Sequence, residues 1–267
     1  MIDIKHAFGF TSEPFPQDVK IEDLYPLPGL DALLKRFFYA VRLSAVSVIT
    51  GDVGSGKSTS LRYATSKLHP SEFKIIPIVA TTGSLLELFR QICLVFGIEY
   101  RSFSIALMTK IVRDIISEIA GRKETPVLVI DEAHLLRSEI YAQLHTLTQF
   151  EFDSKSLMPM ILSGQKKLID KLMYQSSRPL ASRVVGRSYL EGLKLKDMHA
   201  YIHHHLKIAG GREGLFADEA VLAIHQGSGG LLRRANTLAK GALLAAAMEK
   251  CAVATAEHVR LASTEIM

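Results

Sequence analysis

Eight residues in the first quarter of the chain have the types and spacing of a phosphate-binding loop. The run Gly51-Asp52-Val53-Gly54-Ser55-Gly56-Lys57-Ser58 matches every fixed position of G-x-x-x-x-G-K-[ST]. Its glycines let backbone N–H groups turn toward anionic oxygens. The lysine would meet the β- and γ-phosphates, and the serine would ligate Mg²⁺. The motif predicts ATP and Mg²⁺ as cofactors, with nucleotide contacts from Gly51, Asp52, Val53, Gly54, Ser55, Gly56, Lys57, Ser58 and Thr59.

An acidic pair ends a later apolar run, as the partner of such a loop requires. Residues 127–130 are Val-Leu-Val-Ile, and Asp131 and Glu132 follow directly. Asp131 would share the Mg²⁺ shell with Ser58, and Glu132 would polarise the attacking water. The next residues complete an Asp-Glu-Ala-His string, but 267 residues cannot hold two recombinase-like helicase lobes. We therefore expect His134 only to hydrogen-bond locally near a helix start.

A further polar residue stands at the end of another predicted strand, residues 158–163. Ser163 is our candidate for sensing the γ-phosphate or orienting water, and Gln165 competes for the same role. The alternative is that Ser163 only caps the helix expected over residues 165–173.

Arginines in two places could act on the phosphates from other elements. Arg183 is our candidate for reaching a neighbouring subunit's γ-phosphate and stabilising transition-state charge. Arg178 and Arg187 compete for this role, and a solvated face is the alternative for all three. In the C-terminal part, Arg233 follows a glycine turn near a helix start. It would reach back to the γ-phosphate and couple nucleotide state to domain closure.

The elements that must position these residues follow from hydrophobic periodicity. Residues 45–50 form a short β-branched run typical of a buried parallel strand, and residues 58–68 continue as a helix that Pro70 stops. Strands then alternate with helices, which predicts a parallel sheet covered on both faces. The other predicted strands are 74–80, 126–131, 158–163 and 188–190, and the other predicted helices are 31–42, 85–96, 105–119, 138–150 and 165–173.

Strand signals stop after about residue 191. Helical patterns follow at 196–207, 217–225, 231–248 and 255–263, which predicts a small all-helical second domain. The first 30 residues are rich in aromatic residues and proline, so we expect an extended lead-in packed on the domain. The predicted domains are residues 1–30, 31–190 and 191–267.

Composition excludes several classes of protein. With 48% hydrophobic residues the chain has ample core, but no run reaches the 18 apolar residues of a membrane span and no signal peptide opens the sequence. We expect a cytoplasmic protein with no membrane partner. Cys93 and Cys251 lie in apolar helical patterns and are expected to be buried, reduced thiols. A net charge of +5 favours polyanionic partners.

Together these residues resemble the AAA+ ATPases, and the resemblance covers nearly the whole chain. It implies a three-layer αβα nucleotide-binding domain, a helical lid and assembly into a homo-oligomeric ring or helical filament. More narrowly, the chain resembles the general secretion pathway A-type ATPases and the transposon-encoded ATPases of the phage Mu B kind. The matching stretches are residues 8–10, 14–15, 24–25, 51–58, 131–134, 163–165 and 229–236. Leu232 departs from the family pattern, which often has proline there.

The transposition branch is the one we expect. Secretion-type members carry a membrane span and a cell-wall-binding region beyond the ATPase, whereas this chain ends at Met267 after the lid and is basic. The branch implies assembly on double-stranded DNA in the ATP state, recruitment of a DDE-type transposase and disassembly on hydrolysis. Non-specific DNA contacts require residues that meet phosphates. The candidates, each alternatively a solvated surface residue, are Thr81, Thr82, Ser84, Arg101, Lys110 and Arg113.

Two other functions stay open. A secretion- or chaperone-type ATPase would remodel protein and never touch DNA. A nucleotide-gated scaffold would signal by assembly and hardly hydrolyse ATP, but Glu132 argues against it because such a role needs no water-polarising carboxylate.

Overall fold

The computed structural model describes residues 3–99 and 104–265. Its contacts divide the chain into two compact units. One unit consists of Gly29–Gly51 and Lys57–Leu190 and contains the sheet. The other takes in the N-terminal segment up to Pro28, the loop Asp52–Gly56 and the C-terminal helices from Glu191 on.

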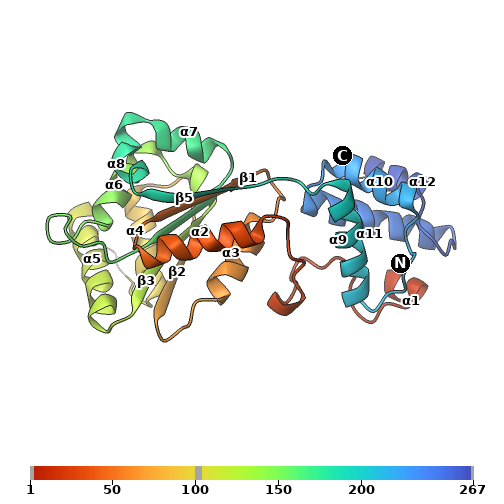
Figure 1. Ribbon diagram of the computed structural model, residues 1–267, viewed down its shortest axis with the longest axis horizontal. Helices are drawn as coiled ribbons and strands as arrows, with labels where there is room; N and C mark the ends of the chain where they lie inside the picture. Colours follow the sequence, from red (N-terminus) through yellow and green to blue (C-terminus); the bar gives the residue numbers. More distant parts are fainter. Residues whose placement is uncertain (1–2, 100–103, 266–267) are drawn as a thin grey trace. The chain divides into compact units, whose positions relative to one another are not determined.

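The first unit is built on a five-stranded parallel sheet with strand order β2-β3-β4-β1-β5. Because β1 lies between β4 and β5, the phosphate loop that follows it leaves from inside the sheet and not from an edge (Figure 1). Ligands of open α/β sheets bind at the carboxyl ends of such strands. The strands are β1 (Val46–Gly51), β2 (Phe73–Val79), β3 (Thr125–Asp131), β4 (Met160–Gly164) and β5 (Val184–Leu190).

Helices cover both faces of this sheet, as β3 shows most clearly. Successive strand side chains point to opposite faces. Leu128 and Ile130 belong to one core cluster, whereas Val127 and Val129 belong to another, and all four are buried. The first cluster includes α4 (Leu85–Val95), α5 (Ile105–Gly121), α6 (Ser138–Leu147), α7 (Lys167–Met173) and α8 (Arg178–Ala181); the second includes α2 (Leu30–Arg42) and α3 (Lys57–Ser66). The predicted three-layer αβα fold is confirmed.

Short 3-10 turns complete this unit. They are η2 (Ala133–Leu135), directly after β3, and η3 (Gln175–Ser177), before α8. The hydroxyl of the fully buried Tyr141 donates to the carbonyl of Ala133 at 2.7 Å, and burial raises its pKa. This bond ties η2 to α6.

The second unit is helical, as predicted. Its apolar core includes the buried side chains of Met198, Ile224, Leu238 and Ala242. The helices are α9 (Leu195–Ile208), α10 (Asp218–Ser228), α11 (Leu232–Met248) and α12 (Ala256–Glu265). Among the residues described, no helix combines the length and the apolar composition needed to cross a bilayer.

The N-terminal segment is not wholly extended, in contrast to the sequence-based expectation. It contains α1 (Ile4–Phe8) and the 3-10 turn η1 (Ile21–Asp23). Asp3 starts α1 because its side chain accepts from the backbone N–H of Lys5, and Gly9 ends it with a left-handed φ of 72°. Farther on, Phe15 is buried and stacks on His205 of α9 with ring centroids 5.4 Å apart. The aromatic residues of this segment thus pack on the helices of their own unit.

Candidate active site

The phosphate loop has the backbone that its glycines predict. Gly54 and Gly56 have φ of 83° and 94°, in the left-handed region that side chains disfavour. Directly after the loop, α3 begins at Lys57. The side chain of Lys57 is 5% exposed, and its Nζ donates to the carbonyl oxygen of Gly51 at 2.9 Å. The lysine is therefore fixed at the carboxyl end of β1.

The hydroxyl and the carboxylate that were predicted to share a metal ion do meet. Ser58, in the first turn of α3, lies against Asp131, the last residue of β3, and its Oγ donates to Oδ2 of Asp131 at 2.6 Å. Mg²⁺ in nucleotide sites takes oxygen ligands and needs only one or two carboxylates, because phosphate and water supply the rest. These two side chains fit such an ion.

Glu132 has a strained backbone next to this pair. Its φ of 52° is unusual for a residue with a side chain and arises as β3 turns into η2. Its N–H donates to Oδ1 of Asp131 at 2.9 Å, and its Oε2 lies 3.3 Å from Nδ1 of His134. The carboxylate is 38% exposed, so water can reach it.

Ser163 and Gln165 occupy different environments at the end of β4. Ser163 pairs with Ile49 of β1 and is fully buried, and its Oγ has no hydrogen-bond partner among the described residues. Gln165 is half-buried, and its backbone N–H donates to Nδ1 of His134 at 3.3 Å. Both stay candidates for the nucleotide sensor.

Arg183 lies between α8 and β5 and forms an ion pair with Asp153 of its own chain. Its side chain is 21% exposed. The competing arginines are more open: Arg178 at the start of α8 and Arg187 on β5 are both exposed. Asp153 thus neutralises the candidate that was predicted to act on a neighbouring subunit.

Arg233 lies in the first turn of α11, in the helical unit. Its backbone N–H donates to the carbonyl oxygen of Gly54, which belongs to the same unit, at 3.3 Å. A Cβ on Gly54 would come within 2.9 Å of the Cβ of Arg233, so this close approach requires glycine. Arg233 as a whole is exposed.

Two of the residues predicted to contact DNA, Arg113 and Ser84, form hydrogen bonds within the protein. Nη1 and Nη2 of Arg113 donate to the carbonyls of Thr146 and Gln149 at 2.7 and 2.6 Å, and the guanidinium lies over Phe150 at 4.4 Å. The hydroxyl of Ser84 caps α4.

The other residues predicted to contact DNA are either exposed or outside the described residues. Lys110 on α5 and the loop residues Thr81 and Thr82 are exposed, with the carbonyl of Thr82 accepting from Nε of Arg137 at 3.1 Å. Arg101 lies outside the described residues.

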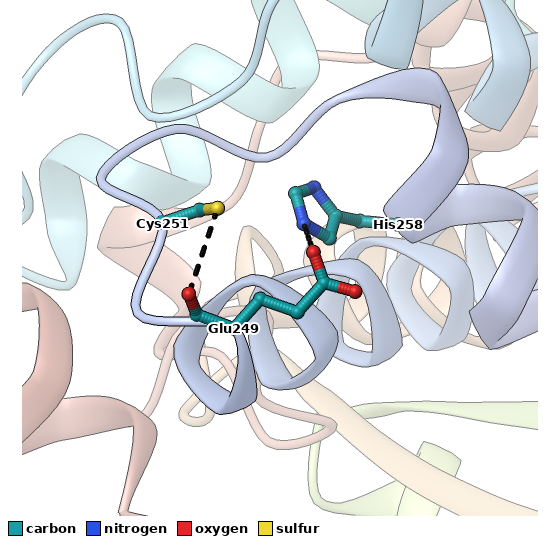
Figure 2. Close-up of side chains that lie close together, drawn as sticks. All are labelled: Glu249, Cys251 and His258. Carbon is teal, nitrogen blue, oxygen red and sulfur yellow. Dashed lines mark hydrogen bonds and ion pairs between the residues drawn. The ribbon is translucent and has the colours of Figure 1, made fainter.

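Cys251 is not in a helix and is not fully buried, which corrects the sequence-based expectation. Because α11 ends at Met248, the cysteine lies in the following loop. There its thiol, the carboxylate of Glu249 and the ring of His258 offer atoms within 4.8 Å of one another (Figure 2). Hydrophobic periodicity predicted the helix end at residue 248 but not this cluster, which depends on the left-handed turn that follows at Lys250, with φ 56°.

Three adjacent histidines of α9, His203, His204 and His205, have separate partners. Nε2 of His203 lies 3.0 Å from the carboxylate of Glu213, and Nε2 of His204 lies 2.7 Å from the carbonyl of Asp23. His205 is buried against Phe15. Their rings therefore meet different groups in the helical unit.

Comparison with known proteins agrees with this geometry. Residues 42–172 match the family described as AAA domain. General secretion pathway protein A of Aeromonas hydrophila is 31% identical over 242 residues, which cover 90% of this chain and 44% of that protein. This chain thus spans less than half the length of that relative.

Two solved structures share the fold at 15% identity. Cdc6p from Pyrobaculum aerophilum matches with a TM-score of 0.75 over 95% of this chain and 70% of its own. The ORC1 protein of Aeropyrum pernix, solved in complex with DNA, matches with a TM-score of 0.69 over 91% of this chain and 67% of its own. The AAA domain match and the identity to General secretion pathway protein A support an AAA+ ATPase of the general secretion pathway A type, and the two solved structures share its fold.

Proposed function

We propose that this protein hydrolyses ATP with Mg²⁺ to ADP and phosphate, and that its nucleotide state controls assembly with a macromolecular partner. The observation that carries the catalytic part is the meeting of Ser58 and Asp131 at 2.6 Å, with Glu132 directly after. An oxygen pair that can hold a cation thus lies beside a water-accessible carboxylate, as hydrolysis of a nucleoside triphosphate requires.

Each residue has a separate task in this proposal. Lys57 holds the β- and γ-phosphates, while Ser58 and Asp131 hold Mg²⁺. Glu132 accepts the proton of the attacking water. When bound, Mg²⁺ neutralises charge that develops on the phosphate oxygens. Ser163 or Gln165 senses the γ-phosphate, and Arg233 couples the nucleotide to the helical unit.

Double-stranded DNA is the partner we propose, with transposition as the process and a DDE-type transposase as the protein recruited. The net charge of +5 favours a polyanion, and the exposed Lys110 offers a contact that is not tied to the core. The ORC1 protein, similar in fold, was solved on DNA. A second candidate is a secretion- or chaperone-type ATPase that acts on protein. The 31% identity to General secretion pathway protein A favours it.

Co-sedimentation with duplex DNA separates these two candidates. The protein is mixed with DNA at low and at physiological salt, with a slowly hydrolysed ATP analogue or without nucleotide. The DNA candidate predicts pelleting that requires the analogue and weakens with salt, and Lys57→Ala is the matched control that should not pellet. ATP hydrolysis without DNA binding at low salt would overturn the DNA candidate and leave the protein-directed one.

A homo-oligomer with shared sites is the assembly that we propose. In it, Arg183 exchanges Asp153 for the γ-phosphate bound by a neighbour. Arg183→Ala should then lose hydrolysis but keep ATP binding. Mixing it with Lys57→Ala should restore part of the turnover, since one active site in the mixture would combine an intact loop with an intact arginine. No recovery in the mixture would contradict a shared site.

A further inference from the structure

His134 receives two contacts of opposite chemical demand on one ring nitrogen. The carboxylate oxygen Oε2 of Glu132 lies 3.3 Å from Nδ1, and the backbone N–H of Gln165 points at the same Nδ1, also at 3.3 Å. The carboxylate can accept a hydrogen bond only if this nitrogen carries a proton, whereas the amide can donate one only if the nitrogen offers a lone pair. An imidazole nitrogen offers one or the other, so the ring can satisfy only one of these neighbours at a time.

Contacts of the η2 backbone and the close approach of Gly164 restrict the position of the His134 ring. Nζ of Lys171 on α7 donates to the carbonyls of His134 and Leu136 at 2.7 and 2.5 Å, which anchors the η2 backbone. A Cβ on Gly164 would stand 3.2 Å from Nδ1 and 3.0 Å from the backbone nitrogen of His134. Glycine therefore lets the end of β4 approach the ring. With the ring held, only the position of its proton decides which neighbour is bonded.

The surroundings keep the ring neutral. His134 is 8% exposed. Burial lowers its pKa, which the carboxylate of Glu132 opposes and the ammonium groups of Lys171, Lys57 and Lys167 reinforce. The two arrangements are then two neutral tautomers. One carries its proton on Nε2 and accepts from Gln165; the other carries it on Nδ1 and donates to Glu132.

We propose that His134 is a positioning residue that couples the end of β4 to the water-polarising carboxylate. While Nδ1 accepts from the Gln165 amide, both oxygens of Glu132 are free to take the proton of water. When the amide moves away, solvent gives a proton to Nδ1 while Nε2 releases one to solvent. Nδ1–H then donates a hydrogen bond to the carboxylate of Glu132, which makes this carboxylate a weaker base. This inference rests on the proposed function, in which Glu132 accepts that proton.

Two substitutions at His134 test the coupling. His134→Leu removes both hydrogen bonds and keeps an apolar group of similar size, whereas His134→Asn places an amide that offers either an acceptor or a donor near the place of Nδ1. We expect His134→Leu to lower kcat about 10- to 100-fold and to leave the Kd of an ATP analogue within about twofold. His134→Asn should recover about tenfold of that loss. His205→Leu, at another buried histidine, in the helical unit, is the matched control and should keep wild-type kcat.

A double-mutant cycle measures the coupling directly. Gly164→Ala would press on the ring and also on the backbone nitrogen and Cβ of residue 134, which the Leu variant keeps. It should therefore lower kcat about tenfold in the wild-type background and by a clearly smaller factor in the His134→Leu background, where the contact with the ring nitrogen is gone. Equal effects in both backgrounds, wild-type kcat in His134→Leu, or an Asn variant no more active than the Leu variant would each overturn the proposal.

Glu132→Gln distinguishes a failure of this inference from a failure of the proposed ATP hydrolysis on which it rests. If Glu132→Gln turns over ATP like the wild type, the proposed role of Glu132 fails. If Glu132→Gln abolishes turnover while His134→Leu does not reduce it, only the coupling through His134 fails.

Discussion

Two glutamate–histidine pairs in this molecule look alike and differ in how the histidine nitrogens are used. Oε2 of Glu132 lies 3.3 Å from His134, and Oε2 of Glu249 lies 3.1 Å from His258. Both rings are buried and both carboxylates are partly or largely exposed. The first pair belongs to the candidate active site, and the second joins the end of α11 to the start of α12 (Figure 2).

The second pair satisfies every nitrogen. Nδ1 of His258 accepts from the backbone N–H of Thr255, the residue before α12, at 2.9 Å. Nε2–H is then available to donate to Glu249. His258 thus acts like the N3 residue of a capping box, bonding back to Thr255, the residue that precedes the helix. A completed set of bonds serves stability, whereas the contested Nδ1 of His134 leaves two states available to a reaction cycle.

The largest expected effect comes from making the same change in both glutamates. Glu132→Gln removes the base but keeps a polar group of equal size, and turnover of ATP should fall about 100- to 1000-fold with analogue binding retained. Glu249→Gln is the matched control and should leave turnover within about twofold. Steady-state ATPase assays with analogue titrations measure both. Comparable turnover in the two variants would remove the functional distinction between the pairs.

A third histidine extends the comparison to acid sensitivity. His205 faces Phe15, Tyr201 and His204, and among the described residues its Nδ1 has no hydrogen-bond partner. Burial, with a smaller contribution from His204, lowers its pKa from 6.5 to about 4. The unfolded chain therefore takes up a proton first as the pH falls. Stability is lost between pH 6.5 and about 4, by up to roughly 3 kcal/mol.

Chemical unfolding at several pH values tests this sign. Between pH 6.5 and 4, the unfolding free energy of the wild type should fall by more than that of His205→Leu, which has no such group to protonate. Measurements above pH 7 provide the baseline, because His205 is neutral in both states there. Parallel losses in the two proteins would show that His205 does not carry the acid sensitivity.

Removing the satisfied histidine should have a smaller, purely structural effect. His258→Leu deletes the bonds to Thr255 and Glu249 and should lower the unfolding free energy by about 1 kcal/mol, as loss of a helix cap does. Turnover by the folded protein should not change. A loss of kcat as large as that expected for His134→Leu would mean that the two pairs do not differ in the way proposed.

The sequence was sufficient for the parts of this fold where each residue has a strong local signal. The loop at residues 51–58 and the strand that ends at Asp131 could be read because a fixed motif and a continuous apolar run coincide. The edge strand β5 was predicted too short, as residues 188–190, because Gly186 and Arg187 interrupt the apolar run that Val184 and Val185 begin.

Contacts between segments that are distant in the sequence could not be predicted from such local signals. The hydrogen bond from Gln165 to His134 depends on how closely η2 approaches the end of β4. Gly164 allows this close approach, but a glycine in the sequence does not predict it. Likewise, Cys251 was expected in an apolar helical pattern although the helix predicted over residues 231–248 ends where α11 ends, and nothing in the local sequence shows that the loop after Lys250 brings the thiol to Glu249 and His258. The residues of the site were therefore predictable by type, and their mutual hydrogen bonds were not.

The smallest expected effect concerns zinc at the second pair. A thiol, an imidazole and a carboxylate are suitable zinc ligands, but Nε2 of His258 carries its proton as long as Nδ1 accepts from Thr255. Binding zinc would require that cap to break, so one molar equivalent of zinc should leave the thermal midpoint unchanged in the wild type and in Cys251→Ser alike. A rise in the wild type that Cys251→Ser abolishes would show that the ion, and not Thr255, determines the tautomer of His258. The distinction between a satisfied and a contested histidine would then hold only for the metal-free protein.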